Sequence, residues 1–297
     1  MSDTLLVTGA SGHLGQLVIT HLLDTLKVPP NRIIATTRHP EKLAALAAKG
    51  VTVRPADFDD IASLTAAFSG AQRLLLISTD ALDRPGHRLA QHKNAVAAAA
   101  KTGVKHVVYT SMPLPEDSPL LIAPDHLGTE QALAASSLSW TLLRDCWYME
   151  NLFMYLPSAL ATGQWYSAAG DGKVAYVSRA DCARAAAMAL ASGDTSKATY
   201  TLTGSEAFTT EDVAKKVSAL VGKPIAVVHV PVEGLIQGMV AATGMPEPVA
   251  AIFASFDTNT KAGRASTVTG DFQKLTGAAP QKFADGLDAN KAVLRGA

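Results

Sequence analysis

The sequence has only two cysteines, Cys146 and Cys182, among its 297 residues. Two cysteines are too few for the disulfide framework of a small secreted domain, so a reducing, cytoplasmic setting is expected. The chain also lacks an uncharged apolar run long enough to span a bilayer, and no basic segment precedes its first apolar stretch as in a signal peptide. These absences predict a globular protein without a membrane segment.

An excess of charge of one sign is missing too. Twenty-six basic and twenty-six acidic side chains cancel, and the Lys and Arg residues form no basic run. Proteins that bind nucleic acid or an anionic membrane surface commonly carry a net positive charge or a basic run. Neither partner is therefore expected, and nothing in the chain predicts a metal site. The hydrophobic content of 48% is enough for a substantial core. The expected oligomeric state is a monomer or a homodimer.

The first half of the chain shows a regular alternation of strand-like and helix-like patterns. The predicted strands cover residues 4–8, 32–37, 51–54, 73–77, 106–110 and 139–143. The predicted helices cover residues 13–26, 41–49, 60–68, 85–102 and 125–136. This alternation is typical of a Rossmann-like α/β fold, a doubly wound parallel sheet with helices on both faces.

After residue 150 the regular alternation stops. Glycines and prolines separate shorter elements, among them predicted helices near 179–191 and 210–221. We therefore expect a first domain over residues 1–150 and a smaller C-terminal α/β lobe over residues 151–297. The segments near 170–192 are expected to pack on the first domain.

The most specific motif is a GxxGxxG pattern that directly follows the first predicted strand. Gly9 lets the chain turn, Gly12 lets the backbone approach a phosphate, and Gly15 lets the next helix pack closely on the sheet. The helix N-terminus then faces the anion. A glycine-rich turn without a ligand is the alternative, but the strand and helix context favours a dinucleotide site. The candidate cofactor-binding residues here are Gly9, Ala10, Ser11, Gly12, His13 and Leu14.

The end of the second strand indicates which dinucleotide binds. An NAD enzyme places an Asp or Glu there to accept from the adenosine ribose hydroxyls, whereas here Thr36 and Thr37 are followed by Arg38. A guanidinium can bind a 2′-phosphate through two parallel hydrogen bonds. The sequence thus predicts NADP(H) in preference to NAD(H). The alternative is that Arg38 is only a solvated loop charge.

Polar and aromatic residues follow the other strands at the same edge of the sheet. Asp57 could accept from the adenine amino group and Phe58 could cover the adenine ring; alternatively, Asp57 with Asp59 and Asp60 only caps the next helix. Ligands of open α/β sheets bind outside the carboxyl ends of the strands. The remaining candidate cofactor contacts are therefore Ser78, Thr79, Thr110 and Ser111.

Six aromatic residues lie between positions 147 and 166, directly after the sixth predicted strand. We expect Trp147, Tyr148 and Phe153 to bind a flat substrate by stacking. A hydrophobic hinge between the two regions is the alternative explanation of the cluster.

The helix after the fifth strand lacks the Tyr-x-x-x-Lys pair of ordinary short-chain dehydrogenases, which disfavours alcohol–ketone chemistry. His126 and Glu130 occur there instead. The candidate catalytic residues are His126, Asp145 and Tyr148. His126 could donate a proton or a hydrogen bond, or only line its helix. Asp145 could hold the nicotinamide amide, orient water or pass a proton, or it could pair with Arg144 or another cation as an architectural charge.

Several segments together carry a family resemblance. They are the glycine motif, Thr37-Arg38-His39-Pro40, Ala56-Asp57-Phe58, Leu75-Leu76-Ile77-Ser78, Gln91-His92-Lys93-Asn94, Tyr109-Thr110-Ser111, His126-Leu127-Gly128-Thr129-Glu130 and Leu142-Leu143-Arg144-Asp145. With these segments the chain resembles the NmrA-like group of atypical short-chain reductases. One departure is that Asp145 stands where the family usually has an asparagine.

The resemblance implies a Rossmann domain with a small C-terminal lobe, NADPH as hydride donor, and a planar conjugated acceptor such as a quinone or an aromatic dye. It also implies a second possible function, because the NmrA-like group includes regulators that sense NADP(H) without turnover and bind a partner protein. The aromatic cluster favours the reductase.

Overall fold

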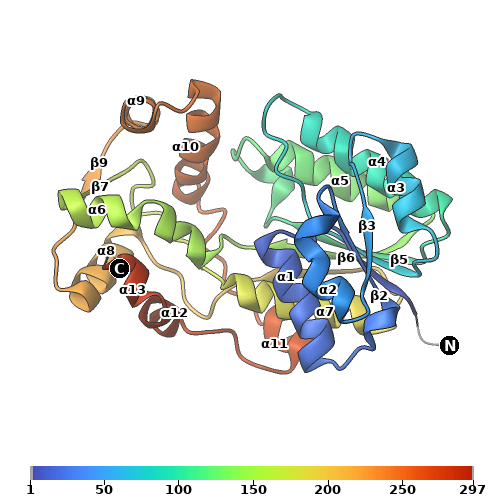
Figure 1. The fold of residues 1–297 in the computed structure, drawn as a ribbon. Helices are drawn as coiled ribbons and strands as arrows, with labels where there is room; N and C mark the ends of the chain where they lie inside the picture. The colour runs from blue at the N-terminus through green and yellow to red at the C-terminus, as the bar shows by residue number, and fades with distance from the viewer. Residues whose placement is uncertain (1–2, 296–297) are drawn as a thin grey trace.

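The computed structural model describes residues 3–295, and its larger part is built on a seven-stranded sheet (Figure 1). All seven strands are parallel, in the order β3-β2-β1-β4-β5-β6-β8. The strands are β1 (Leu5–Val7), β2 (Ile33–Thr37), β3 (Thr52–Pro55), β4 (Arg73–Leu76), β5 (His106–Ser111), β6 (Ser139–Asp145) and β8 (Ala198–Leu202). The predicted Rossmann-like sheet is thus confirmed, and the limits of the six predicted strands shift by no more than two residues.

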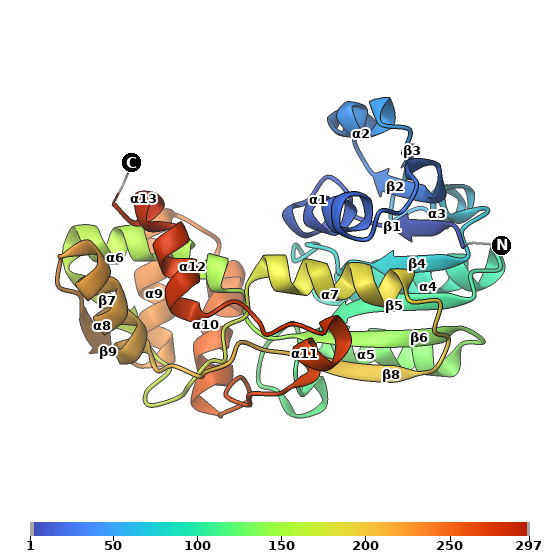
Figure 2. The same cartoon turned by 90° about the horizontal axis from the view of Figure 1, so that it is seen from below.

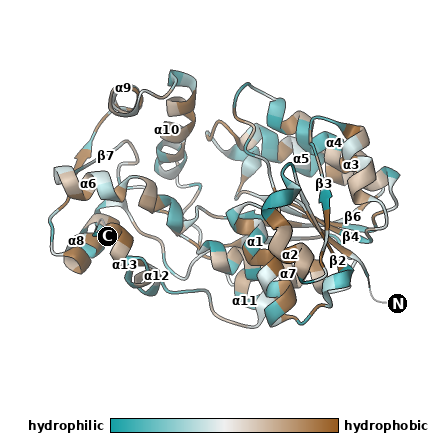
Figure 3. Ribbon diagram, viewed as in Figure 1, coloured by the Kyte–Doolittle hydropathy of each residue, from teal (hydrophilic) through white to brown (hydrophobic). Residues whose placement is uncertain are grey.

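Helices cover both faces of this sheet because successive strand residues point to opposite sides. On β1, Leu5 and Val7 belong to one buried cluster, and Leu6 between them belongs to another. The first cluster is covered by α1 (His13–Thr20), α7 (Arg179–Ala191) and α11 (Asp271–Thr276). The second is covered by α3 (Ile61–Phe68), α4 (His87–Lys101) and α5 (Ala123–Ala135). In Figure 3 both the hydrophobic and the hydrophilic colour occur along the helices around the sheet, as expected for helices with one face toward a core.

Several predicted helices have irregular ends or parts. The helix predicted over 13–26 is α-helical to Thr20 and continues as a π-helical turn over His21–Thr25. The helix predicted over 41–49 begins as a 3-10 turn over Pro40–Leu43 before α2 (Ala44–Ala48). Two further 3-10 turns cover Pro30–Arg32 and Pro115–Asp117.

The chain leaves the sheet after β6 and returns to it for α7 and β8 (Figure 2). The buried Arg73 of β4 holds the end of α7 against the sheet, because its guanidinium lies at the C-terminal end of that helix. It donates at 2.7–3.1 Å to the backbone carbonyls of Ala189, Leu190 and Asp194. Strand β8 was not among the predicted strands.

A smaller lobe lies beside the carboxyl end of the sheet (Figures 1 and 2). It contains a 3-10 segment over Met149–Met154, α6 (Leu156–Thr162), β7 (Gln164–Ser167), α8 (Thr210–Val221), β9 (Ala226–His229), α9 (Val232–Thr243), α10 (Glu247–Lys261), α12 (Phe283–Ala289) and α13 (Lys291–Leu294). Strands β7 and β9 pair in parallel. Its own buried cluster includes Leu152, Leu156, Phe208, Val213 and Phe283. No helix within residues 3–295 is long and apolar enough to cross a membrane.

Candidate cofactor and substrate site

The glycine motif forms a tight turn between β1 and α1. Gly9 has a left-handed backbone with φ of 58°, and its carbonyl accepts from the Gly12 amide at 2.9 Å. A Cβ atom on Gly15 would collide with the Gly9 carbonyl and the Cα of Ala10, so only glycine lets α1 pack this closely. The turn therefore has the strand, turn and helix geometry that the motif predicts.

This turn fits the diphosphate of a dinucleotide. Gly9, Gly12 and His13 are exposed, and the first amides of α1 have no partner within their helix. The side chains of Ala10 and Leu14 are buried in the core, so these two residues can offer only backbone groups.

Arg38 follows the end of β2 and is exposed. Within residues 3–295 it forms no ion pair, so its guanidinium is available for a phosphate. The neighbouring Thr37 hydroxyl bonds the Ser11 hydroxyl at 2.8 Å and accepts from the His39 amide at 3.1 Å. These contacts tie the end of β2 to the glycine turn.

The loop after β3 places Asp57 on the surface and buries part of Phe58 against the core. Asp60, and not Asp57, caps α3 by accepting from the Ala62 amide at 2.8 Å. Asp57 instead accepts from the Asp59 amide at 3.0 Å. The capping alternative is thus wrong for Asp57, because it lies too early in the loop to reach the helix amides.

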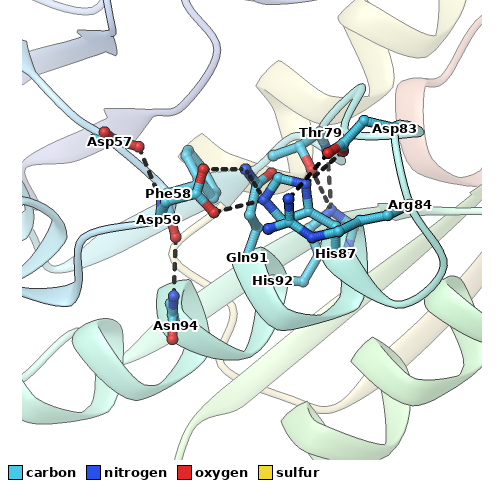
Figure 4. Close-up of polar contacts among 10 residues, drawn as sticks. All are labelled: Asp57, Phe58, Asp59, Thr79, Asp83, Arg84, His87, Gln91, His92 and Asn94. Carbon is cyan, nitrogen blue, oxygen red and sulfur yellow. Dashed lines mark hydrogen bonds and ion pairs between the residues drawn. The ribbon is translucent and has the colours of Figure 1, made fainter.

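A histidine bridge joins this loop to the loop after β4 (Figure 4). His87 contacts Asp59 at 2.7 Å through Nε2 and Asp83 at 2.5 Å through Nδ1. The hydrogen bonds to Asp83 and Asp59 raise the pKa of His87, because donation from both nitrogens requires the imidazolium. Gln91 also donates to Asp59, at 3.1 Å. This bridge was not predicted from the sequence, although Asp83, His87 and Gln91 are spaced i, i+4, i+8.

The hydroxyl residues at the ends of β4 and β5 are engaged with one another or with nearby helices. The Ser78 amide donates to Thr110 Oγ1 at 2.9 Å, and the Thr79 amide donates to His92 Nε2 at 3.0 Å. Ser111 donates to Glu130 at 2.6 Å. These contacts hold the strand ends in place, and Ser78, Thr110 and Ser111 also line the cavity described below.

His126 lies on α5, is buried, and contacts the Tyr109 hydroxyl through Nδ1 at 2.9 Å. Burial lowers the pKa of His126 well below its ordinary value, and the nearby Arg88 charge lowers it further. His126 is therefore a neutral imidazole, which can donate or accept a hydrogen bond but does not carry an extra proton near neutral pH.

Arg144 and Asp145 point to opposite faces of β6, as successive strand residues do. Arg144 binds the buried Glu130 in a bidentate pair, with distances of 3.0 Å from Nε and 2.7 Å from Nη2. The alternative that Asp145 is the partner of Arg144 is therefore wrong. Glu130 is also fully engaged, since it accepts from Ser111 as well.

Asp145 is 9% exposed, and its Oδ2 accepts from the Tyr148 hydroxyl at 2.7 Å. Its other oxygen, Oδ1, is buried without a hydrogen-bond partner in the described structure. Burial raises the pKa of Asp145 to about 7, and it raises the pKa of Tyr148 well above its ordinary value. Asp145 is thus a carboxyl group that can hold a proton near neutral pH.

A cavity of about 790 Å³ lies between the sheet edge and the small lobe. It brings together Ser78, Thr110, Ser111, His126, Asp145, Trp147 and Tyr148. The small lobe adds an aromatic and aliphatic wall that includes Tyr155, Trp165, Leu235, Met239 and Phe256. The rings of Trp147 and Phe256 lie 3.7 Å apart between centroids. The cavity is large and apolar enough for a flat aromatic molecule.

Phe153 is absent from this cavity wall. It packs instead against the buried cluster of the small lobe. The segment is a 3-10 helix, in which Tyr148, Asn151 and Met154 recur every three residues and face the cavity, while Phe153 falls on another side.

Within residues 3–295 no group of three or more His, Cys, Asp or Glu side chains is arranged to hold a metal ion.

The sequence matches the NmrA-like family over residues 1–284. It is 39% identical over 271 residues to quinone oxidoreductase 2 of Escherichia coli, which covers 91% of this chain and 93% of that protein. It is 30% identical over 296 residues to the NAD(P)H azoreductase of Xenophilus azovorans, covering 98% of this chain and 99% of that one.

Solved structures of two reductases also resemble this chain. An NADPH-dependent quinone oxidoreductase of Escherichia coli in complex with NADPH matches with a TM-score of 0.90 and 37% identity, over 96% of this chain and 99% of that one. Triphenylmethane reductase of Citrobacter sp. in complex with NADP(H) matches with a TM-score of 0.89 and 36% identity, over the same 96% and 99%. The sequence match and the shared fold show that the chain belongs to the NmrA-like family.

Proposed function

We propose that the protein is an NADPH-dependent reductase that transfers a hydride to a quinone or another planar conjugated acceptor, such as an aromatic dye. The observation that carries this proposal is the position of a large aromatic-walled cavity at the same sheet edge as a glycine turn fitted for a diphosphate. The relatives named above, which include a quinone oxidoreductase, an azoreductase and a triphenylmethane reductase, support it.

The glycine turn and the N-terminus of α1 would hold the diphosphate of the cofactor. Arg38 would select NADPH by binding its 2′-phosphate, and the loop with Asp57 and Phe58 would lie at the adenine. NADPH, when bound, supplies a hydride. Ser78 and Ser111 lie where the sheet edge meets the cavity, which is the position expected for contacts to the nicotinamide end.

The cavity wall would bind the acceptor by stacking and would exclude water from it. Trp147 and Tyr148 provide flat surfaces next to the sheet, and the small lobe covers the other side. Orientation of this kind supplies much of the rate of a hydride transfer, because the two reacting atoms need close and aligned approach.

The reduction of a quinone to a hydroquinone needs a proton as well as a hydride. We assign its supply to Asp145 with Tyr148, because the buried carboxyl holds a proton up to about pH 7 and lines the cavity. The neutral His126 would donate or accept a hydrogen bond at the same wall. A proton leaving Asp145 would be replaced from solvent after the product departs.

The decisive experiment mixes the purified protein with NADPH and a panel of quinones, aromatic dyes and simple carbonyl compounds, and follows the loss of reduced nicotinamide absorbance. We expect turnover with quinones or dyes, none with simple carbonyl compounds, and weaker activity with NADH. Tight NADPH binding without turnover of any acceptor would instead favour an NADP(H)-sensing regulator.

We also propose a cytoplasmic setting, which the two free buried thiols support. We propose that the protein is a monomer or a homodimer, which analytical sedimentation would test.

A further inference from the structure

Arg88 is a buried arginine in the cavity wall. It lies in the first turn of α4, is 6% exposed, and lines the cavity together with Ser78 and His126. Its Nε donates to the Thr79 carbonyl at 2.6 Å. Its Nη1 is buried and has no hydrogen-bond partner in the described structure.

The charge of Arg88 is not neutralised by contact. Asp80 and Asp125 lie near enough to act on it through space, but no carboxylate of residues 3–295 forms an ion pair with it. The other arginine in the cavity wall, Arg264, pairs with Asp117 at 2.5 Å. A buried guanidinium stays protonated, and without an ion-pair partner its charge carries a large desolvation cost. An anion entering the cavity would remove that cost.

We propose that Arg88 binds an anionic oxygen group of the acceptor, so that the cavity favours planar acceptors that carry a carboxylate, sulfonate or phosphate. This inference rests on the proposed function, since it names the class of acceptor. The cofactor phosphates share the same chemistry. The turn that fits the diphosphate, residues 9–14, contributes nothing to the cavity wall, so we assign the anion at Arg88 to the acceptor.

The test measures binding without reduction. Isothermal titration calorimetry on the cofactor-free protein compares naphthalenesulfonate with the uncharged naphthalenemethanol. The variants are Arg88→Gln, which removes the charge, Arg88→Lys, which keeps a charge without the forked geometry, and Arg264→Gln as the matched control in the same wall. Circular dichroism melting establishes that each variant is folded, and NADPH affinity is measured for each.

The wild type should prefer the sulfonate. Arg88→Gln should weaken sulfonate binding by on the order of tenfold to a hundredfold, as expected for a charge-assisted hydrogen bond, and should change binding of the alcohol by less than about twofold. The sulfonate affinity of Arg88→Lys should lie between those of the wild type and Arg88→Gln. Arg264→Gln should keep the preference for the sulfonate.

Equal effects of Arg88→Gln on both probes, or no effect on either, would overturn the proposal. So would a loss of NADPH affinity with the sulfonate preference unchanged, because the cofactor would then be the anion at Arg88. None of these measurements requires turnover, so a failure here leaves the reductase activity as a separate question with its own assay.

Discussion

The hydroxyl of Tyr148 donates a hydrogen bond to Asp145, with 2.7 Å between the two oxygens, and both side chains line the cavity. This contact satisfies only one carboxyl oxygen, while the other is buried without a partner. Desolvation therefore outweighs the hydrogen bond, and the pKa of Asp145 rises to about 7. The charge at the centre of the site consequently depends on pH in the neutral range.

The replacement Asp145→Asn should have opposite effects on the two sides of pH 7, with little change in NADPH affinity. Below about pH 7 it should lower quinone turnover, because an amide cannot supply the proton that the carboxyl holds there, and above neutral pH it should raise turnover by on the order of tenfold. An ionised carboxylate repels the negative charge that develops on the acceptor oxygen, whereas an amide can donate to it. Wild-type turnover should fall as pH rises through about 7, and the profile of the variant should be flatter. Identical rates and pH profiles for the two proteins would show that Asp145 does not face the reacting atoms.

The same replacement should change stability in a pH-dependent way. The Asp145 carboxyl ionises near 3.8 when unfolded and at about 7 when folded, so between these values the folded state holds the extra proton. Wild-type stability should decrease across this window by at most about 1.4 kcal/mol per pH unit and then level off. In urea unfolding, the stability of Asp145→Asn relative to wild type should rise over the same window. A constant difference would mean that this carboxyl is ionised in the folded protein throughout.

Arg38→Ala should weaken NADPH binding by about 2 kcal/mol and leave NADH binding nearly unchanged, because only NADPH carries the 2′-phosphate. Fluorescence titration with both cofactors measures the difference. Lys49→Ala is a suitable control, since it removes an exposed positive charge at the end of α2. Equal losses for the two cofactors would refute the assignment of Arg38.

Gly12→Val and Gly15→Val should separate binding from folding. A Cβ on Gly12 meets only the Gly9 carbonyl, at 3.3 Å, so Gly12→Val should fold but lose both dinucleotides. A Cβ on Gly15 collides with the backbone of the turn, so Gly15→Val should also lower the melting temperature. Retained cofactor affinity in Gly12→Val would mean that the turn does not hold the diphosphate.

His87→Asn should loosen the loop between β4 and α4. The two carboxylate contacts raise the pKa of His87, so their stabilising effect is complete below the unfolded value of 6.5 and is lost as pH rises through the folded value. Hydrogen exchange of the amides near residues 80–86, corrected for intrinsic rates, should therefore speed up with rising pH in the wild type. In His87→Asn it should be fast throughout, whereas the exposed His39→Asn should behave like the wild type.

The centre of the sheet could be predicted because β1, β2, β4 and β5 are short runs buried on both faces, with helical periods between them. Strand β8 was missed because it lies at the edge of the sheet and reads Ala-Thr-Tyr-Thr-Leu, with only Leu202 fully buried. The two-stranded pairing of β7 with β9 depends on contacts between segments about sixty residues apart, which local patterns do not encode.

Local geometry around the candidate site could be predicted where the residue type itself implies it. The glycine turn is such a case, since the left-handed backbone at Gly9 favours glycine and the close approach at Gly15 permits no other residue. The Arg144–Glu130 pair and the unpaired Arg88 could not be foreseen, because each depends on which faces of distant elements meet. The position of Phe153 depends on the 3-10 geometry of its segment, which the sequence pattern did not reveal.

The contact of Arg73 with the end of α7 has a consequence for how the protein is made. A ribosome releases β4 more than one hundred residues before the carbonyls that Arg73 requires. Until those residues emerge, burying Arg73 would leave a charge without acceptors, and both α7 and edge strand β8 are missing from the sheet. The nascent sheet should therefore stay incomplete until residues near 200 have left the exit tunnel.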